Sequence, residues 1–458
     1  MSAMEWHGHW WLPEAPEDKV PGRLVVEPDG ESRLELIGGF DLVIRESPGA
    51  GMFRRVPVIL GHALGKPATL LDCFTLTTRG GFFSRPQFFH RLHVHRVLIG
   101  AHVGQTEPAF RSARVQIENL TNWLAFPAAN RTSDLRETTY VASVRAIEPL
   151  SVAVDGWTIQ ARSHAQPFQL TQTREQDVVS SEITAYLFLI PDSPTSANGF
   201  DELILQIMDL VTLASGEPSG LISATLFHTD RREHPNADGS TSELPIEVES
   251  YGRRIHTAEP EAAAVPFHQF RFTCDDLPFD QLIADWMRIR SKASTACNVY
   301  FGLQYSRPGF TETRLLMNAI ASEALHSSLY GDATSMSKEH FASLRSKVLA
   351  ALDDEDDRRW VKANLRNGPS LRERLRALAS VPDGSAVKAL IDDIEVWARR
   401  LVLARNGLAH TGSEDGDGDI FRLEWVTSGL LALVLMAELD LPGEIQKRAA
   451  INLLSLPG

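Results

Sequence analysis

The spacing of the apolar residues changes once along this 458-residue chain, and that change constrains the fold more than any other feature. Before about residue 270, segments such as GRLVVEP and SRLELIGGF alternate apolar and polar residues, which is typical of strands with one buried face. From about residue 278, apolar residues recur every three or four positions, as in helices with one buried stripe. The sequence therefore predicts an α+β architecture: a β-rich N-terminal domain, residues 1–277, followed by an all-α helical bundle, residues 278–458.

Turn and capping residues give local detail to this prediction. The Asp-Gly pair at 155–156 lies between two alternating runs and predicts a β-hairpin. One helix, 201–216, is expected within the β-rich region and ends at a glycine. Ser370 and Glu373 have the spacing of a capping box at the start of a later helix. The polar stretch 228–242 predicts a mobile loop.

Composition limits the class of protein. The net charge of −14 disfavours a protein that coats nucleic acid through a broad basic field, although it leaves room for a local basic site. Three widely separated cysteines without a CxxC argue against a disulfide scaffold or a thiolate zinc site. The first residues lack the pattern of a signal peptide, and the apolar run 430–441 is too short to span a bilayer. We therefore expect a cytoplasmic protein without membrane contact.

The segment LARNGLAHTG, 403–412, places polar residues where a buried helix would be apolar. A single amphipathic helix is predicted from about 385 to 410, with apolar residues at helical spacing: Leu390, Ile394, Trp397, Leu401 and Leu408. Arg405 falls within roughly 40° of Leu401 on such a helix. Asn406 and His410 follow it directly. These three side chains are the candidate catalytic residues.

Their chemistry suits the cleavage of RNA, which carries its own nucleophile in the 2′-hydroxyl group. Cleavage needs a group that moves protons, and a histidine that titrates near neutral pH provides it, here His410. It also needs a cation for the charge on phosphorus, and the guanidinium of Arg405 is suitable. The amide of Asn406 would orient one of the two. This chemistry requires no metal and no cofactor.

Helix geometry separates two members of this set. Five residues on an α-helix turn through about 500°, so Arg405 and His410 lie about 140° apart. Either the helix distorts at its end, or two copies meet about a two-fold axis and pool their side chains in one cleft. The alternative interpretation is structural: the histidine would interact with the negative end of the helix dipole, and the arginine would extend from the stripe edge to solvent.

Several segments resemble one family of proteins. LVLARNGLAH resembles the R-N-x-x-x-H signature of HEPN-domain ribonucleases. GHWWLPEAPEDKVPGRLVVEPDGESRLELIGGF and FRSARVQIENLTNWL resemble the N-terminal domain of ApeA-like antiphage defence proteins. LPFDQLIADWMRIR, RLLMNAIASEALHSSLYG and PSLRERLRAL resemble segments of their HEPN-type helical bundle, in the same order.

This resemblance implies a metal-independent ribonuclease that acts in abortive antiphage defence, with tRNA as a candidate target. It implies that Arg405 and His410 are the catalytic pair, accompanied by Asn406. HEPN ribonucleases dimerise, so a homodimer through the C-terminal bundle is expected. The N-terminal domain would then be a sensor or gate that binds a phage-derived trigger.

Glu323 and His326 match the polar pattern on the first helix of the family's bundle, where they would support the catalytic pair. They are three residues apart and so share a helix face. A contact on the helix surface is the alternative interpretation of this pair.

A basic segment is a weaker candidate for RNA binding. Residues 358–376 contain Glu373 as their only acid, and their seven basic residues are Arg358, Arg359, Lys362, Arg366, Arg372, Arg374 and Arg376. Such an excess would attract a phosphate backbone. Two solvated helix faces are the alternative. His93 and His95 share a strand face but lack an apparent third ligand, so no metal site is predicted.

The sequence favours an RNA endonuclease that leaves a 2′,3′-cyclic phosphate and a 5′-hydroxyl. The competing hypothesis is a non-catalytic protein, in which the bundle is a dimerisation scaffold and the β-rich domain binds a ligand. The presence of Arg405, Asn406 and His410 together favours the enzyme, because a scaffold has no need of all three.

Overall fold

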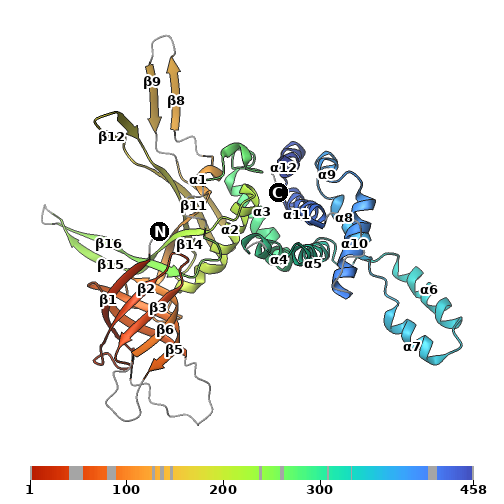
Figure 1. Ribbon diagram of the computed structural model, residues 1–458, viewed down its shortest axis with the longest axis horizontal. Helices are drawn as coiled ribbons and strands as arrows, with labels where there is room; N and C mark the ends of the chain where they lie inside the picture. Colours follow the sequence, from red (N-terminus) through yellow and green to blue (C-terminus); the bar gives the residue numbers. More distant parts are fainter. Residues whose placement is uncertain are drawn as a thin grey trace. The chain divides into compact units, whose positions relative to one another are not determined.

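The computed structural model describes residues 3–40, 55–79, 89–125, 129–134, 139–144, 148–236, 240–257, 263–306, 309–331, 333–410 and 420–455. The chain divides into two compact units, Met1–Ala284 and Asp285–Gly458. Strands dominate the first and helices the second (Figure 1). The predicted fold class, a β-rich region followed by a helical one, is confirmed. The domain boundary predicted between residues 277 and 278 stays a prediction.

Six antiparallel strands close into a barrel at the start of the first unit: β1 (Met4–Trp11), β2 (Val20–Val26), β3 (Ser32–Ile37), β4 (Arg55–Ala63), β5 (Lys66–Arg79) and β6 (Phe89–Ile99). The strand order is β6-β3-β2-β1-β4-β5, and β5 pairs back onto β6, which closes the ring. Alternate residues of each strand point inward and form one core that includes Trp10, Leu24, Leu34, Ile59 and Leu70. Closure pairs the strands on both sides, so this ring needs no protection of its edges.

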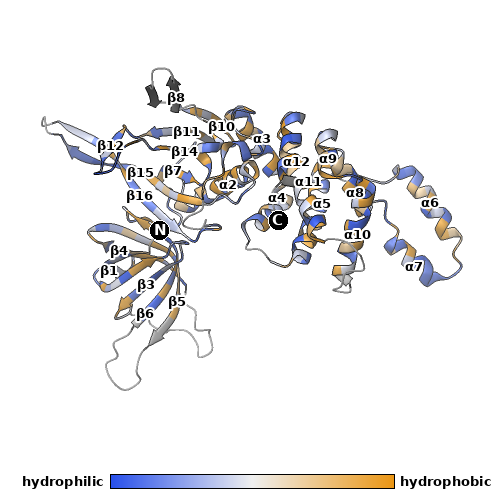
Figure 2. Ribbon diagram, turned by 45° about the horizontal axis from the view of Figure 1, so that its top comes forward, coloured by the Kyte–Doolittle hydropathy of each residue, from blue (hydrophilic) through white to orange (hydrophobic). Residues whose placement is uncertain are grey.

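The same sheet continues beyond the barrel through six further strands: β7 (Phe110–Ile117), β10 (Leu150–Val154), β11 (Trp157–Ala165), β14 (Ile183–Pro191), β15 (Leu221–Pro235) and β16 (Thr241–Gly252). Their order is β10-β11-β14-β7-β15-β16, and β16 pairs with β6. Helix α2 (Asp201–Ser215) lies against one face of this extension (Figures 1 and 2). The Trp157 ring on that face lies 5.5 Å from the Phe200 ring, at the start of the helix.

Two of the local predictions for this unit are confirmed. Asp155 and Gly156 connect β10 to β11 with φ of 48° and 81°, as a tight hairpin turn requires. Helix α2 ends at Gly216, whose φ of 80° lies in the left-handed region that favours glycine. The remaining small elements of the unit are helix α1 (Leu120–Trp123), the 3-10 turns at Ala197–Phe200 and Phe267–Gln269, and two ribbons, β8 (Ala129–Asp134) with β9 (Thr139–Val144) and β12 (Gln169–Gln172) with β13 (Asp177–Ser180).

The loop predicted at 228–242 is wrong, because β15 and β16 continue through most of it as an antiparallel hairpin. Residues 237–239 of this stretch lie outside the described residues. The side chains from Thr229 to Pro235 are all exposed, so no buried face marks them as a strand. A register shift between Phe227 and Arg231 also interrupts the alternation. The backbone pairing therefore exists without the apolar pattern by which a strand is recognised.

The second unit is built from helices: α3 (Phe279–Lys292), which begins in the first unit, then α4 (Ser294–Tyr305), α5 (Thr311–Tyr330), α6 (Lys338–Ala350), α7 (Glu355–Asn364), α8 (Leu371–Ala379), α9 (Gly384–Leu390), α10 (Ile394–His410), α11 (Ile420–Glu438) and α12 (Gly443–Ser455). Of the helices in the described residues, α11 alone is long and apolar enough to cross a membrane. However, 67% of that stretch is buried, as expected of the central helix of a bundle.

The single helix predicted at 385–410 is wrong, because residues Ile391–Asp393 interrupt it and separate α9 from α10. Ile391 adopts an extended conformation after α9. Asp393 then accepts a 3.0 Å hydrogen bond from the backbone N–H of Val396 and so caps the start of α10. Leu390, Trp397 and Leu401 are nevertheless buried, so the apolar stripe continues across the break.

The predicted capping box at Ser370 and Glu373 is confirmed at the start of α8. The hairpin of α6 and α7 that precedes it extends away from the other helices of the unit (Figures 1 and 2). Neither of these two helices has a buried residue. Trp360 of α7, for example, is 67% exposed.

Candidate functional site

Helices α5 and α10 place an arginine beside a carboxylate at one end of the bundle. Arg405 Nη2 of α10 lies 3.6 Å from Glu323 Oε1 of α5. The two side chains are 32% and 35% exposed. Because they are separated by 82 positions in the sequence, only the packing of the helices brings them together. Of the two residues expected to support the catalytic pair, Glu323 therefore contacts Arg405 directly.

Arg405 also contacts its sequence neighbour. Its Nη1 donates a 3.2 Å hydrogen bond to Oδ1 of Asn406, whose side chain is exposed. Its Nε is buried and has no hydrogen-bond partner among the residues that the structure describes. Two side chains thus hold the outer part of the guanidinium, and a third of the side chain stays open to solvent. An arginine held in this way retains donors for an anionic ligand.

His410 is the last residue of α10. The backbone is α-helical through this residue, while its side chain and residues 411–419 lie outside the described part of the chain. An α-helix that is regular to His410 keeps the angle of about 140° to Arg405. The end of the helix beyond His410, where a distortion was expected as one of the two routes, lies outside the described residues, so both routes stay predictions.

His326 lies one helical turn beyond Glu323 but has different surroundings. It is only 3% exposed, and its ring centroid lies 4.7 Å from that of Tyr330. Its Nδ1 has no hydrogen-bond partner among the described residues. Burial, and to a lesser extent the positive charge of Arg374, lowers the pKa of His326. The imidazole is therefore neutral at pH 7.

The basic residues of 358–376 do not form one surface. Arg358 and Arg359 of α7 pair with Glu355 and Asp356 of the same helix, at 3.6 and 2.9 Å. Arg372 and Arg376 of α8 both pair with Glu395 of α10 at 2.6 Å.

The other three members of the set differ from these pairs. Arg374 lies on the opposite face of α8 from Arg372 and Arg376 and donates a 2.9 Å hydrogen bond to Ser327 of α5. Lys362 and Arg366 are exposed. Much of the predicted positive charge is therefore neutralised by neighbouring carboxylates.

A buried polar network behind the site was not predicted from the sequence. Glu424 of α11 accepts hydrogen bonds from Arg314 Nε at 3.1 Å and Asn318 Nδ2 at 3.0 Å, both on α5. Trp397 Nε1 of α10 donates a 3.2 Å hydrogen bond to Thr427 Oγ1 of α11. This network could have been suspected from the sequence, because Asn318 and Glu424 lie on helix faces that are otherwise apolar.

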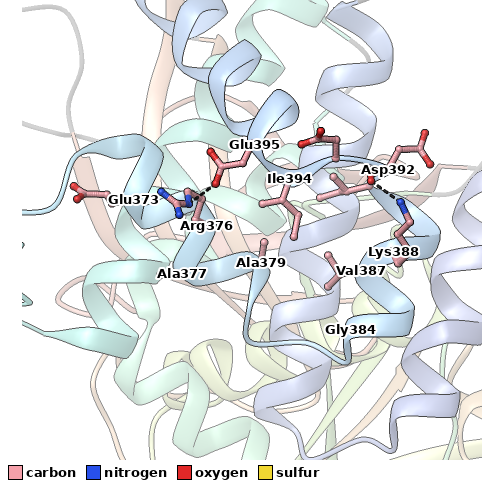
Figure 3. Close-up of a pocket in the computed structure, with 12 residues that line it drawn as sticks. Glu373, Arg376, Ala377, Ala379, Gly384, Val387, Lys388, Asp392, Ile394 and Glu395 are labelled. Atoms are coloured by element: carbon pink, nitrogen blue, oxygen red, sulfur yellow. Dashed lines mark hydrogen bonds and ion pairs between the residues drawn. The ribbon is translucent and has the colours of Figure 1, made fainter.

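A cavity of about 830 Å³ opens between α8, α9 and the start of α10 (Figure 3). Its floor is apolar, and its rim carries the Arg376–Glu395 pair and Lys388, which donates to the carbonyl of Asp392. Eleven residues of helix, about 16 Å, separate Ile394 in this cavity from Arg405. The cavity is therefore a different site from the polar cluster, which we define as Arg405, Asn406 and Glu323. The chemistry of its side chains favours the cluster as the functional site.

Metal ligands do not gather at the cluster. Across the described ranges, no three His, Cys, Asp or Glu residues are placed to hold a metal ion. Burial raises the pKa of the thiols of Cys73 and Cys274, so these cysteines are held as neutral thiols.

The sequence matches two protein-domain families. Residues 5–286, more than half of it, match the family described as ApeA N-terminal domain 1. Residues 316–444 match the Apea-like HEPN family, and this range includes Glu323 and the three candidate catalytic residues. No curated protein and no solved structure matches the chain. A HEPN domain suggests ribonuclease function and an RNA substrate.

The lowered pKa of His326 predicts a pH dependence of stability. The unfolded chain binds a proton on this residue near pH 6.5, whereas the folded chain resists it, so acid stabilises the unfolded state. The stability that the neutral His326 contributes is complete above about pH 6.5 and is lost as the pH falls through that value. We expect His326→Leu to reduce the fall in Tm of the helical unit between about pH 7.5 and about pH 5.5.

Thermal unfolding followed by the helical circular dichroism signal measures this difference. His340→Leu changes an exposed histidine of α6 and is the matched control. It should keep the acid sensitivity of the unaltered protein. An equal fall in Tm for His326→Leu and the unaltered chain would contradict the prediction.

Proposed function

This chain belongs to the ApeA family, with an ApeA N-terminal domain 1 and an Apea-like HEPN domain, and we propose that it is a metal-independent RNA endonuclease. Its catalytic residues in this proposal are Arg405, Asn406 and His410. The observation that carries the proposal is the contact of Arg405 with Glu323 and Asn406 in the matched HEPN range. A partly exposed guanidinium held by two side chains is suited to binding a phosphate.

The proposed reaction uses only groups of the RNA and of this chain. His410 takes the proton from a 2′-hydroxyl, whose oxygen attacks the adjacent phosphorus. The bond from phosphorus to the 5′-oxygen breaks, and that oxygen receives a proton. The products are a 2′,3′-cyclic phosphate and a 5′-hydroxyl. Arg405 stabilises the negative charge that builds on the phosphoryl oxygens, and Asn406 and Glu323 hold its guanidinium in place.

We place the site at an interface between two copies of the helical unit. Val396 and Leu403 of α10 are 41% and 58% exposed, and their spacing of seven residues puts them on one face of the helix. A second α10 on this face would cover both apolar side chains, and Arg405, about 160° around the helix from Leu403, would reach the shared cleft along the edge of the helix. It would also supply a second histidine, so that one His410 could act as base and the other as acid.

The finer roles are proposals as well. The N-terminal domain restrains the nuclease until a phage-derived trigger binds, and the cleaved RNA, with tRNA as candidate, halts the infected cell. A ligand that moves the population from 1:99 to 99:1 in favour of the active state needs roughly 5.5 kcal/mol of differential binding.

The basic residues of α7 and α8 assist RNA binding where their positive charge is not neutralised by an ion pair. The protein acts in the cytoplasm.

Cleavage without metal is the first consequence. In EDTA, the full-length protein should cut RNA and leave cyclic phosphate ends, and His410→Ala should reduce the rate by about 100- to 10,000-fold. Typing the RNA ends by their susceptibility to phosphatase and kinase measures this. His340→Ala, at an exposed histidine of α6, is the matched control and should cut normally. A requirement for magnesium together with 3′-hydroxyl ends would show that the mechanism is wrong.

Dimerisation through α10 is the second consequence. Leu403→Glu should convert the dimer to a monomer in analytical ultracentrifugation, because it places a charge on the proposed contact face. Leu344→Glu, at a 38% exposed leucine of α6, is the control and should stay dimeric. Mixing Arg405→Ala with His410→Ala protein should restore part of the activity that each lacks alone. A fully active monomer would refute the shared site.

Restraint by the N-terminal domain is the third consequence. A fragment of residues 278–458, which retains all of α3, should cut saturating concentrations of RNA faster than the full-length chain does. Circular dichroism and sedimentation first establish that the fragment is helical and dimeric. The same fragment with His410→Ala controls for a contaminating nuclease. A folded, dimeric fragment that is inert beside an active full-length chain would show that the N-terminal domain serves catalysis instead of restraining it.

A further inference from the structure

The sheet extension of the N-terminal unit has a second face, opposite α2. Residues that alternate along its strands point to opposite sides. On one side Ala113, Val115, Ile159, Leu187 and Leu189 are fully buried. On the other side a cross-strand row runs from Gln160 through Phe188 and Arg114 to Thr225, on strands β11, β14, β7 and β15. We call this second side the outer face.

Arginines lie over aromatic rings on the outer face. The Arg162 guanidinium is 4.6 Å from the Phe188 ring centroid. The Arg114 guanidinium is 5.7 Å from the centroid of Phe227 and 5.8 Å from that of Tyr186. The Phe188 and Phe227 rings are nearly parallel, with an interplanar angle of 24°. Two guanidinium groups are thus supported by a layer of three rings.

The part of the outer face formed by β11, β14 and β7 carries arginines and no carboxylates, although the chain as a whole is acidic. The chain has 59 acidic residues and a net charge of −14, yet β7, β10, β11, β14 and the part of β15 up to His228 contain no Asp or Glu in their sequence. The acids begin at the border, where Glu247 of β16 pairs with Arg114 at 3.3 Å.

Arg162 lies away from that border and is exposed. Its Nη2 donates a 2.6 Å hydrogen bond to Gln160 Oε1, and no carboxylate lies within ion-pair distance of it in the described residues. Beyond Arg114, the face leads into a cavity of about 390 Å³ beside the barrel, lined by Thr225, Glu249 and Tyr251 among others.

We propose that the outer face binds single-stranded RNA. Unpaired bases stack on aromatic rings and on the planes of arginine side chains, and the same guanidinium groups attract the phosphates. A duplex would not fit, because its bases are already stacked inside the helix. This surface lies outside the matched HEPN range, so it is a second contact for RNA. The inference extends the proposed ribonuclease function by assigning a recognition role to the N-terminal unit.

Binding to a non-cleavable RNA tests the proposal independently of the nuclease chemistry. The probe is a fluorescent oligomer of about 12 nucleotides whose 2′-hydroxyls are methylated, titrated with the full-length protein. Arg162→Ala should weaken binding roughly tenfold and reduce the slope of affinity against salt, because it removes a stacking plane and a phosphate contact. Arg174→Ala removes the same charge from an exposed position outside this face and should stay within about twofold of the unaltered protein.

Photocrosslinking locates the contact. The same oligomer carrying 5-iodouridine should crosslink to peptides that contain Tyr186 or Phe188, and Arg162→Ala should reduce that yield. Crosslinks confined to the helical unit, or equal affinities for Arg162→Ala and Arg174→Ala, would overturn the proposal even if the protein cuts RNA. Displacement of the probe by polyglutamate as readily as by poly(U) would also overturn it, since the face would then recognise negative charge alone, as a site for an acidic protein would.

Discussion

Two polar residues one turn apart on the buried helix α11 fix the geometry on which the candidate site depends. Glu424 accepts hydrogen bonds from Arg314 and Asn318 of α5, and three residues later Thr427 accepts one from Trp397 of α10. Glu424 and Thr427 are 3% and 0% exposed, so a broken bond at either position would leave an unsatisfied polar group in the core. The register of α5 and α10 is therefore set by one turn of α11, and Arg405 meets Glu323 as a consequence.

The Arg405–Glu323 pair itself contributes little to stability. Both side chains are about one-third exposed, and ion pairs of this kind typically contribute between 0 and about 1 kcal/mol. Its value is orientational, because it fixes a long and flexible side chain in one place. The carboxylate also has a cost for function, since it offsets part of the positive charge that a phosphate would meet. A weak pair at 3.6 Å suits an arginine whose guanidinium must exchange one anionic partner for another.

Features governed by local chemistry could be predicted from the sequence, and features governed by distant contacts could not. The hairpin at Asp155-Gly156 and the capping box at Ser370 follow from backbone preferences within four residues. The break at Ile391–Asp393 was missed because Leu390 and Trp397 continue the same apolar stripe through the interruption. The β15–β16 extension was missed because its side chains are exposed on both faces, so its sequence lacks the alternation of apolar and polar residues that identifies a strand.

The candidate site divides in the same way. Arg405, Asn406 and His410 lie within six residues and could be named from the sequence together. The Arg405–Glu323 contact joins two helices through the packing against α11, which no local pattern encodes. The outer face of the sheet extension is a similar case. Arg162, Phe188 and Phe227 come from three strands, and only the strand order β11-β14-β7-β15 makes them neighbours.

The two roles proposed for the N-terminal unit, restraint of the nuclease and binding of RNA, are linked by thermodynamics. RNA that binds the outer face equally well in the restrained and active states raises the local concentration of substrate but leaves the equilibrium between those states unchanged. RNA that binds the active state more tightly shifts the equilibrium toward it, and by reciprocity any trigger that favours the active state then tightens RNA binding by the same factor. In the first case the outer face only delivers RNA to the helical unit, and a separate ligand must supply the whole energy of activation. In the second case substrate and trigger share that energy, so a trigger with a modest preference is sufficient.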